Sequence, residues 1–469
     1  MMINPFFFRD IPSTDKVFIS NLLGEWSILK SREELYALVS SSLKGGQLNE
    51  LAAKGFYSES DTEALSFSKA AELNLTAKFS KGLFRPSLIM VVPTLRCDHD
   101  CAYCQVSRAP LSSVDHELEM KPAQIAQAID KIAAPAFKLE IQGGEPLLRP
   151  RFIIDLVKEL RVLRGHGFDV VIASALGPDM SDDFLEWMHT ENVSLSVSFD
   201  GIPSVHSKIR KSRLFDSFER FKQQLKRLSD ANLSKNVGFV STITREIIEL
   251  GPRKIISACS DLGIRRIYSR PIANYGFATV TKKLIGYSRK EYSDFLEAYI
   301  DEIVKSFQRG EVFFDEGIGL YLSNLYSPEL NVHVDMQSPS GYALSACIVN
   351  YDGNIFGSDE ARMLFESTKN PLLPLARISG SELLENNIEG HEGLISSSFS
   401  ECSPLCDTCA YMPFCGSDPV HHLASQGDFV GLKPNSGYCH HITDIYDILI
   451  KKIGNGEITN KMVVSWLKR

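Results

Sequence analysis

The sequence predicts an α/β protein built around a parallel sheet, and two observations lead to this class. Between residues 88 and 273, apolar runs of strand length alternate with longer segments of helical periodicity. Within the run 193–199, apolar residues alternate with three serines, which is the clearest strand pattern in the chain. Six strand–helix units in series favour parallel strands covered by helices.

The elements follow one another regularly through this region. The expected strands cover 88–92, 137–142, 169–174, 193–199, 236–243 and 265–272. The expected helices cover 121–132, 151–163, 181–189, 215–229, 252–261 and 288–309. Ser288, with Glu291 three residues later, is a capping box that predicts where the last helix begins. After residue 309 the pattern is irregular until cysteines return near the end of the chain.

Residues 1–80 are expected to form a separate small domain. Two strands, 17–20 and 25–29, precede a helix that Ser31 and Glu34 would open as a capping box. A second short helix is expected over 48–54. This pattern resembles the small winged-helix modules that bind leader peptides, which implies precursor-peptide binding. The alternative is a domain that only packs against the rest of the protein.

Length and composition restrict the class of protein. A chain of 469 residues is long enough for two or three domains. The net charge of −8 argues against a nucleic-acid partner, and no apolar run approaches the roughly 20 residues of a membrane span. Ten cysteines without a secretion signal favour metal binding in a reducing compartment, so a cytoplasmic location is expected.

Three cysteines follow the first expected strand of the sheet. Cys97, Cys101 and Cys104 have C-x3-C-x2-C spacing in a loop at that strand's carboxyl end. Three thiolates would bind three irons of a 4Fe–4S cluster and leave the fourth open, whereas electron-transfer clusters usually take four cysteines. An open iron indicates a bound substrate or cofactor. The alternatives are a zinc knuckle, which lacks a nearby fourth ligand here, and three unrelated thiols.

These residues, with the aromatic Tyr103 before the last cysteine, resemble the signature of the radical S-adenosylmethionine (SAM) superfamily. The resemblance implies that SAM binds the open iron and is cleaved reductively to a 5′-deoxyadenosyl radical that abstracts a hydrogen atom. It also implies a partial (β/α)6 TIM-like barrel over 85–310. Catalytic groups would then lie at the carboxyl ends of the strands.

A glycine-rich turn directly follows the second strand. Gly143, Gly144 and Glu145, followed by proline, let the backbone approach a ligand closely. Such a turn alone is weak evidence, but its place after the cysteine loop makes the signal specific. The family resemblance assigns these three residues to the methionyl amino group of SAM.

The segment after the fourth strand also resembles the family. Ser198, Asp200 and Arg210 match its pattern, in which the serine serves the ribose hydroxyls and the arginine the carboxylate of SAM. His206 belongs to the same segment, and the alternative for it and Arg210 is a solvated loop. Residues 174–176 depart from the Thr-Asn-Gly of many relatives, which leaves the contacts of that loop open.

A second cysteine cluster lies near the end of the chain. Cys406, Cys409, Cys415 and Cys439 resemble the SPASM region of radical SAM enzymes that modify peptides. The resemblance implies that these four residues bind one auxiliary 4Fe–4S cluster in a domain over 311–469. The rival interpretation is a structural zinc site with four cysteine ligands.

A further auxiliary cluster that many relatives carry is expected to be lost. Ser358 and Asp418 stand where the resemblance calls for cysteine ligands, and both are poor replacements for thiolates. Cys347 is then either a remnant or a partner of Cys402. Asp359 follows Ser358, and in sulfatase-maturing relatives an aspartate at this place accepts the substrate's proton. The alternative for Asp359 is a surface turn.

The runs 97–108, 358–362 and 415–419 most resemble the B-type maturase of the His-Xaa-Ser peptide modification system. That implies a ribosomally made precursor peptide as substrate, an electron donor such as flavodoxin or ferredoxin, and a second radical SAM maturase as partner. Cross-linking or a related oxidation of the peptide is the first hypothesis. The others are sulfatase-maturase-like oxidation of a Cys or Ser on a protein, and a non-catalytic iron–sulfur scaffold.

Overall fold

The structure is a computed structural model that describes residues 2–80, 85–327, 333–334, 336–380, 382–385 and 388–467. The chain divides into two compact units. The first comprises Met1–Leu83, Ile318–Ser340 and Ile395–Arg469, and the second comprises Phe84–Gly317 and Gly341–Leu394. Residues 341–394, which the sequence placed with the second cysteine cluster, therefore belong to the unit that contains the first.

The second unit contains an 11-stranded sheet in the described part of the chain. The six expected strands are confirmed as β6 (Leu88–Val91), β7 (Phe137–Ile141), β8 (Phe168–Ser174), β9 (Ser194–Ser198), β10 (Val237–Thr242) and β11 (Arg266–Arg270). Each is parallel to its neighbours, so their carboxyl ends lie at one edge. Neither end strand of the described sheet pairs with the other, which agrees with a partial barrel.

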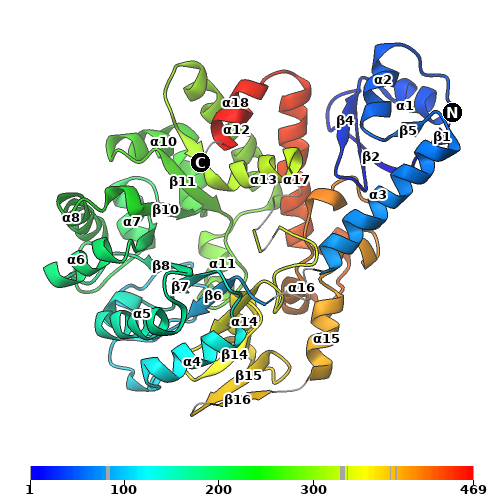
Figure 1. Cartoon of the computed structure of the whole chain (residues 1–469). Helices are drawn as coiled ribbons and strands as arrows, with labels where there is room; N and C mark the ends of the chain where they lie inside the picture. Colours follow the sequence, from blue (N-terminus) through cyan, green and yellow to red (C-terminus); the bar gives the residue numbers. More distant parts are fainter. Residues whose placement is uncertain are drawn as a thin grey trace. The chain divides into compact units, whose positions relative to one another are not determined.

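The expected helices of this unit are also confirmed. They are α4 (Pro122–Ile132), α5 (Pro150–Arg164), α6 (Asp182–Thr190), α8 (Ser217–Asp230), α10 (Pro252–Asp261) and α12 (Arg289–Gln308). Figure 1 shows α4, α5, α6 and α8 along the outer side of the parallel strands. Their apolar residues face the sheet, as in Ile125 and Ile129 of α4, which are fully buried. Ser288 and Glu291 form the predicted capping box of α12.

The expectation of irregular chain after residue 309 is wrong. Two further strands, β12 (Phe314–Asp315) and β13 (Ala346–Val349), add to opposite ends of the parallel strands. Strands β14 (Asn354–Phe356), β15 (Pro374–Ser379) and β16 (Glu382–Glu385) continue the sheet in antiparallel pairing. These strands are short, and their sequence pattern gives little periodicity to detect.

The first unit begins with a three-stranded antiparallel sheet in the order β2-β3-β4. It comprises β2 (Phe6–Asp10), β3 (Val17–Asn21) and β4 (Trp26–Leu29), followed by α1 (Arg32–Val39), α2 (Gly46–Ala53) and α3 (Asp61–Ser80). The strands and the first two helices share a core that includes Val17, Leu29 and Leu51. The predicted capping box at Ser31 is wrong, because Glu34 accepts the backbone N–H of Lys30 and the Ser31 side chain makes no cap bond.

The N-terminal sheet packs on the last segment of the chain within the same unit. Phe18 of β3 lies 5.5 Å, between ring centroids, from Tyr411, and Ser20 donates a hydrogen bond of 2.6 Å to the carbonyl of Ala410. Arg9 forms two hydrogen bonds of 2.7 Å with Asp447 in α17 (Gly437–Gly454). Residues 1–80 thus share a packed interface with the segment that carries the second cysteine cluster.

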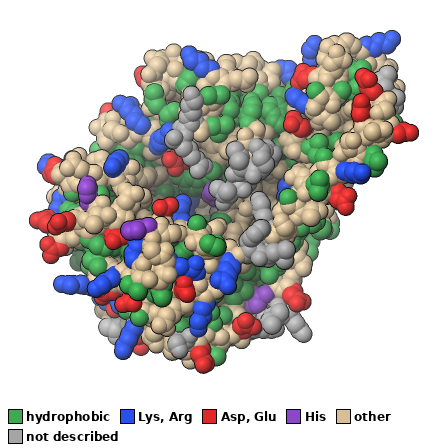
Figure 2. Space-filling view, viewed as in Figure 1, with side chains coloured by type: hydrophobic (Ala, Val, Ile, Leu, Met, Phe, Trp, Pro, Cys, Tyr) green, Lys and Arg blue, Asp and Glu red, His purple; other side chains and the backbone are tan. Residues whose placement is uncertain are grey.

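Two properties of the described residues limit the kind of partner: the length and polarity of the helices, and the distribution of charge. In the described part of the chain, no helix is long and apolar enough to cross a membrane. On the face drawn in Figure 2, Lys and Arg side chains are interspersed with Asp and Glu side chains. This mixture agrees with the net charge of −8 on a chain with 50 basic and 58 acidic residues.

Candidate active site and cysteine clusters

The first cysteine loop begins where β6 ends, and backbone hydrogen bonds hold it in place. The N–H of Cys97 donates to the carbonyl of Ala109 at 3.1 Å, and the N–H of Ala102 donates to Ile209 at 3.0 Å. Burial raises the pKa of the Cys97 thiol, and the nearby Cys101 adds to that rise. Burial, together with Cys104, raises the pKa of Cys101 to about 12 although Arg210 opposes this. The structure therefore brings the three predicted ligands together.

The glycine turn after β7 is joined directly to this loop. The N–H of Gly144 donates to the carbonyl of Thr94 at 2.9 Å, and that of Glu145 donates to Arg96 at 2.8 Å. A Cβ atom on Gly144 would lie 2.2 Å from the carbonyl oxygen of Arg96, and Gly143 has a φ of +134°. Only glycine fits such a close approach without a shift of the backbone. The two signatures that the sequence paired are thus in contact.

The Glu145 side chain is buried and bonded inside the protein. One oxygen of its carboxylate accepts hydrogen bonds from Leu147 N at 3.1 Å and Ser174 Oγ at 2.9 Å. The other accepts from Ala175 N at 3.0 Å. Burial, and next the nearby Asp98, raise the pKa of Glu145 to about 8, although its hydrogen bonds oppose the shift. Glu145 thereby fixes the glycine turn to the end of β8. The segment 174–176, which departs from the family pattern, binds the Glu145 carboxylate through Ser174 and Ala175.

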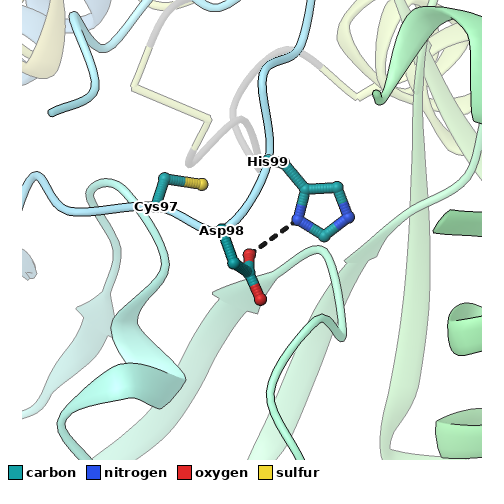
Figure 3. Close-up of side chains that lie close together, drawn as sticks. All are labelled: Cys97, Asp98 and His99. Atoms are coloured by element: carbon teal, nitrogen blue, oxygen red, sulfur yellow. Dashed lines mark hydrogen bonds and ion pairs between the residues drawn. The ribbon is translucent and has the colours of Figure 1, made fainter. Parts of the chain in front are cut away.

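Asp98 and His99 are site residues that the sequence analysis missed. His99 Nδ1 lies 2.7 Å from Asp98 Oδ1, and Nε2 lies 3.0 Å from Ser217 Oγ at the start of α8. Figure 3 shows the Asp98 carboxylate turned toward the His99 ring. With Cys97 these side chains could hold an ion, since their ligand atoms lie within 4.8 Å of one another. Both ring nitrogens are hydrogen-bonded, however, which favours a buried tether that fixes the cysteine loop to α8.

Three predicted cofactor-binding residues form a buried network beside Cys101. Arg210 Nε donates to Asp200 Oδ2 at 2.7 Å, and the Tyr103 hydroxyl donates to the same oxygen. Asp200 Oδ1 accepts from Thr242 N at 3.0 Å. The guanidinium lies 5.2 Å from the centroid of the Tyr103 ring, and its Nη1 lies 3.8 Å from Cys101 Sγ. This arrangement places a fixed positive charge next to a candidate cluster ligand.

Two further residues of the predicted segment, Ser198 and His206, lie close in sequence to this network. Ser198 is the last residue of β9, at the carboxyl edge of the sheet. His206 is fully buried, and its ring centroid lies between 5.5 and 5.9 Å from those of Phe199, Phe218 and Phe221. Burial lowers the pKa of His206 to about 3, and its Nδ1 accepts the N–H of Asp200. His206 is therefore a neutral histidine of the core, next to the site.

Asp359 is the first residue of α14 (Asp359–Thr368) in the same unit. Its Oδ1 accepts a hydrogen bond of 2.7 Å from Arg362 Nε, and its side chain is 14% exposed. Arg362 is fully buried, and its Nη1 lies 3.5 Å from the carbonyl of Val106, two residues after Cys104. Asp359 is thus connected to the cysteine loop through Arg362. The sequence analysis missed Arg362, although its i+3 spacing from Asp359 on a helix was a usable signal.

The four cysteines of the second cluster come together in the first unit. Burial raises the pKa of the Cys415 thiol, and the nearby Cys409, Cys406 and Cys439 raise it further. Burial raises the pKa of Cys406 to about 11, and the nearby Lys433 opposes the rise. Lys433, which is only 6% exposed, lies near Cys406 and Cys415 and is another residue that the sequence analysis missed. A lysine there would compensate the negative charge of thiolates.

The residues that stand in place of the expected cluster ligands have other structural roles in this chain. Ser358 Oγ accepts the N–H of Ala361 at the start of α14, and Asp418 accepts the N–H of His421 at the start of α16 (Pro419–Gln426). Both are therefore helix N-caps, for which Ser and Asp are preferred. Cys347 is buried in the middle of β13, whereas Cys402 is exposed. Cys259 is buried in α10.

Comparison with known proteins supports these observations. Residues 91–247 match the model of the Radical SAM superfamily. The chain is 26% identical over 210 residues to the sporulation killing factor maturation protein SkfB of Bacillus subtilis (strain 168). That alignment covers 44% of this chain and 45% of SkfB, so the match spans less than half of the relative's length.

Two solved structures share the fold over most of this chain. The anSMEcpe protein with bound AdoMet has a TM-score of 0.64 at 15% identity and covers 82% of this chain and 98% of its own. Streptococcus suis SuiB bound to the precursor peptide SuiA has a TM-score of 0.52 at 16% identity and covers 94% and 100%. The cysteine loop and the glycine turn, which are in contact, both lie within residues 91–247, the segment that matches the Radical SAM superfamily model.

Proposed function

We propose that this chain is an enzyme that cleaves SAM reductively and modifies a ribosomally synthesised precursor peptide. The observation that carries the proposal is the convergence of three thiols in a loop bonded directly to a glycine turn. This convergence lies inside the segment that matches the Radical SAM superfamily. A non-catalytic scaffold would not need a backbone approach as close as that at Gly144.

The residues present fit a 4Fe–4S cluster with an open iron, together with SAM. Cys97, Cys101 and Cys104 offer three thiolate ligands, the number that leaves one iron free. When bound, the cluster and SAM supply a 5′-deoxyadenosyl radical that abstracts a hydrogen atom from the substrate. Arg210 supplies a buried positive charge beside Cys101, and the absence of a Cβ at Gly144 lets the glycine turn pack against the backbone of the cysteine loop. Burial of the surrounding network excludes water from the reacting groups.

The second cysteine set fits one auxiliary 4Fe–4S cluster. Cys406, Cys409 and Cys439 each act on the Cys415 thiol, so the four residues can offer ligands together, and the buried Lys433 near Cys406 and Cys415 would supply a compensating charge. A zinc site with four cysteines would use the same ligands. The resemblance to the SPASM region favours iron and sulfur.

A peptide substrate is supported by the names of the relatives. SkfB is a maturation protein, and SuiB has been solved with its precursor peptide SuiA. In the first unit, β4 is an edge strand of the sheet β2-β3-β4 in the described residues, and a peptide can pair with an edge strand. We infer that residues 1–80 bind the precursor peptide and that a flavodoxin or ferredoxin supplies the electron. A His-Xaa-Ser repeat peptide, a second maturase and a cytoplasmic location complete the proposal.

Asp359 is proposed as the proton acceptor during product formation. One carboxylate oxygen is held by Arg362, and the side chain is partly exposed, so the other oxygen is available to a substrate. A carboxylate held in this way is oriented without being enclosed. When the substrate radical is oxidised, the proton that leaves would pass to Asp359 and the electron to the auxiliary cluster.

The test is hydrogen transfer from a peptide. A perdeuterated His-Xaa-Ser repeat peptide is incubated with reconstituted enzyme, SAM and a reductant, and the products are analysed by mass spectrometry. We expect deuterium in 5′-deoxyadenosine and a peptide that has lost two hydrogen atoms, one as the transferred deuterium and the other as a proton or deuteron. Deuterium transfer only from a folded protein carrying a Cys or Ser target would instead support the sulfatase-maturase-like alternative.

A further inference from the structure

One surface beside the cysteine loop has an unusual composition for this chain. Helix α11 (Phe277–Ile285) exposes three apolar side chains at helical spacing. Phe277 is 41% exposed, Val280 80% and Leu284 74%. Such side chains occur singly on most surfaces, but three on one face form a stripe that requires an explanation. We call this stripe, with the neighbouring cations described next, the α11 surface.

The α11 surface is basic, although the chain as a whole is acidic. Lys282 and Lys283 flank the apolar stripe and are exposed. Neither 272–290 nor 204–214 contains an Asp or Glu, whereas the chain carries 58 acidic and 50 basic residues. In the second segment, Lys211 is also exposed. Asp100 is paired with Arg108 and Arg213, and Glu246 is paired with Lys208.

Hydrogen bonds attach this surface to the loop of the cluster ligands. The Thr281 hydroxyl donates to the carbonyl of Ala102 at 2.6 Å, and the N–H of Ala278 donates to the carbonyl of Cys104 at 3.3 Å. The N–H of Ala102 donates in turn to the carbonyl of Ile209, in the second basic segment. Both segments thus meet at Ala102, which lies directly after Cys101. Cys101 and Cys104 are themselves partly exposed.

We propose that the α11 surface is the docking site of an acidic electron-transfer protein that reduces the first cluster. The inference rests on the proposed function, since it requires a cluster on Cys97, Cys101 and Cys104. A small apolar contact ringed by lysines suits a brief encounter with a negatively charged partner. Charge attraction raises the rate of encounter, and the backbone bonds to Ala102 and Cys104 bring the partner close to the cluster ligands.

The test compares a protein reductant with a chemical one. Initial rates of 5′-deoxyadenosine formation are measured with increasing reduced flavodoxin of strongly negative charge, and separately with dithionite. For Lys282→Glu/Lys283→Glu, we expect the flavodoxin concentration for half-maximal rate to rise about tenfold at low salt, because rim charges act on association. The effect should shrink at high salt, where charges are screened. Val280→Ser/Leu284→Ser should weaken the response to flavodoxin with little dependence on salt.

The control variant is Lys158→Glu/Lys254→Glu, which makes the same charge change on the exposed faces of α5 and α10. It should respond to flavodoxin as the parent does, and all variants should keep the parent's rate with dithionite. Equal flavodoxin response in the parent and both α11 variants would overturn the proposal. The proposal would also be overturned if the α11 variants formed 5′-deoxyadenosine normally with flavodoxin but no longer modified the peptide. That result would identify the α11 surface as a peptide-binding site. No 5′-deoxyadenosine from the parent with dithionite would refute the proposed function itself.

Discussion

At the scale of single residues, Asp359 and Arg362 show how the structure changes a sequence interpretation. The sequence left Asp359 as either a proton acceptor or part of a surface turn. Asp359 forms an ion pair with a fully buried arginine, and a guanidinium is rarely buried without a specific partner. This ion pair excludes the interpretation of Asp359 as part of a simple surface turn. Arg362 Nη2 has no hydrogen-bond partner among the described residues, so Asp359 is the main compensation for this buried charge.

We expect Asp359→Asn to uncouple the two halves of the reaction. Asn keeps the shape and can still accept from Arg362, but it cannot take up a proton at neutral pH. The variant should form 5′-deoxyadenosine at a near-normal rate and release little modified peptide. The measurement is the ratio of modified peptide to 5′-deoxyadenosine by mass spectrometry. A ratio equal to the parent's would show that another group accepts the proton.

Arg362→Ala provides the companion measurement on stability. Removing one partner of a buried ion pair typically costs about 3–5 kcal/mol, because the remaining charge is uncompensated. Asp359 is 14% exposed and partly solvated, so the lower end of that range applies. We expect a lowered unfolding temperature, and partial recovery in Arg362→Ala/Asp359→Asn. Full additivity of the two substitutions would contradict a direct interaction.

Glu145 predicts a specific dependence of stability on pH. Its folded pKa of about 8 lies above the ordinary 4.5, so the unfolded chain releases this proton at lower pH than the folded chain does. Stability should therefore fall as pH rises from about 4.5 to about 8.

The variant Glu145→Gln cannot ionise, so its free energy of unfolding should not show this fall with pH. The substitution also removes the hydrogen bond from Ala175 N. Denaturant midpoints of the apoprotein at pH 5 and pH 8 test this, with the exposed Glu186→Gln as control. Parallel slopes in Glu145→Gln and the parent would contradict the raised pKa.

At the scale of elements, periodicity was sufficient to predict six strands of the parallel region and six of its helices, but not the helices α7 (Pro203–Ile209), α9 (Arg245–Leu250) and α11. Each of the predicted elements has a strong apolar pattern, and capping at Ser288 located the start of α12. The strands β12 to β16 were missed because two to six residues carry too little pattern. The N-caps at Ser358 and Asp418 were visible as residue types but were interpreted only as lost cluster ligands.

The glycine turn gives the sharpest test at this scale. Gly144→Ala would place a Cβ 2.2 Å from a backbone oxygen, so the turn must separate from the cysteine loop. We expect the variant to lose SAM cleavage and part of its iron from the first cluster. Gly46→Ala at the start of α2 meets no atom within 4 Å and should behave as the parent. Normal SAM cleavage by Gly144→Ala would show that the contact is not needed.

The iron content tests whether Ser358 is only a helix cap. We expect about eight irons per chain after anaerobic reconstitution, because each of two 4Fe–4S clusters holds four. Ser358→Cys restores a thiol but removes the cap of α14, and cap loss typically costs about 0.5–2 kcal/mol. We expect this variant to be less stable and to bind no additional iron. About twelve irons in the parent would show that Cys347 or Cys402 takes part in another cluster.

At the scale of the whole molecule, the sequence did not predict which segments of the chain make up each of the two compact units. The N-terminal sheet packs on the second cysteine segment through pairs such as Arg9 and Asp447, which lie 438 residues apart. No local pattern signals such a contact. Tyr411, between Cys409 and Cys415, contacts both Phe18 and Asp447. A peptide bound by residues 1–80 would therefore lie on the same packed unit as the auxiliary cluster.

The most direct test of the central claim is SAM cleavage that depends on the first cysteine loop. 5′-Deoxyadenosine is quantified after incubation of the reconstituted protein with SAM and dithionite, for the parent and for Cys97→Ala/Cys101→Ala/Cys104→Ala. The parent should produce 5′-deoxyadenosine, and the triple variant should produce none while it keeps about half of the iron on the second cysteine set. No 5′-deoxyadenosine from an iron-loaded parent, or equal amounts from both proteins, would contradict the account.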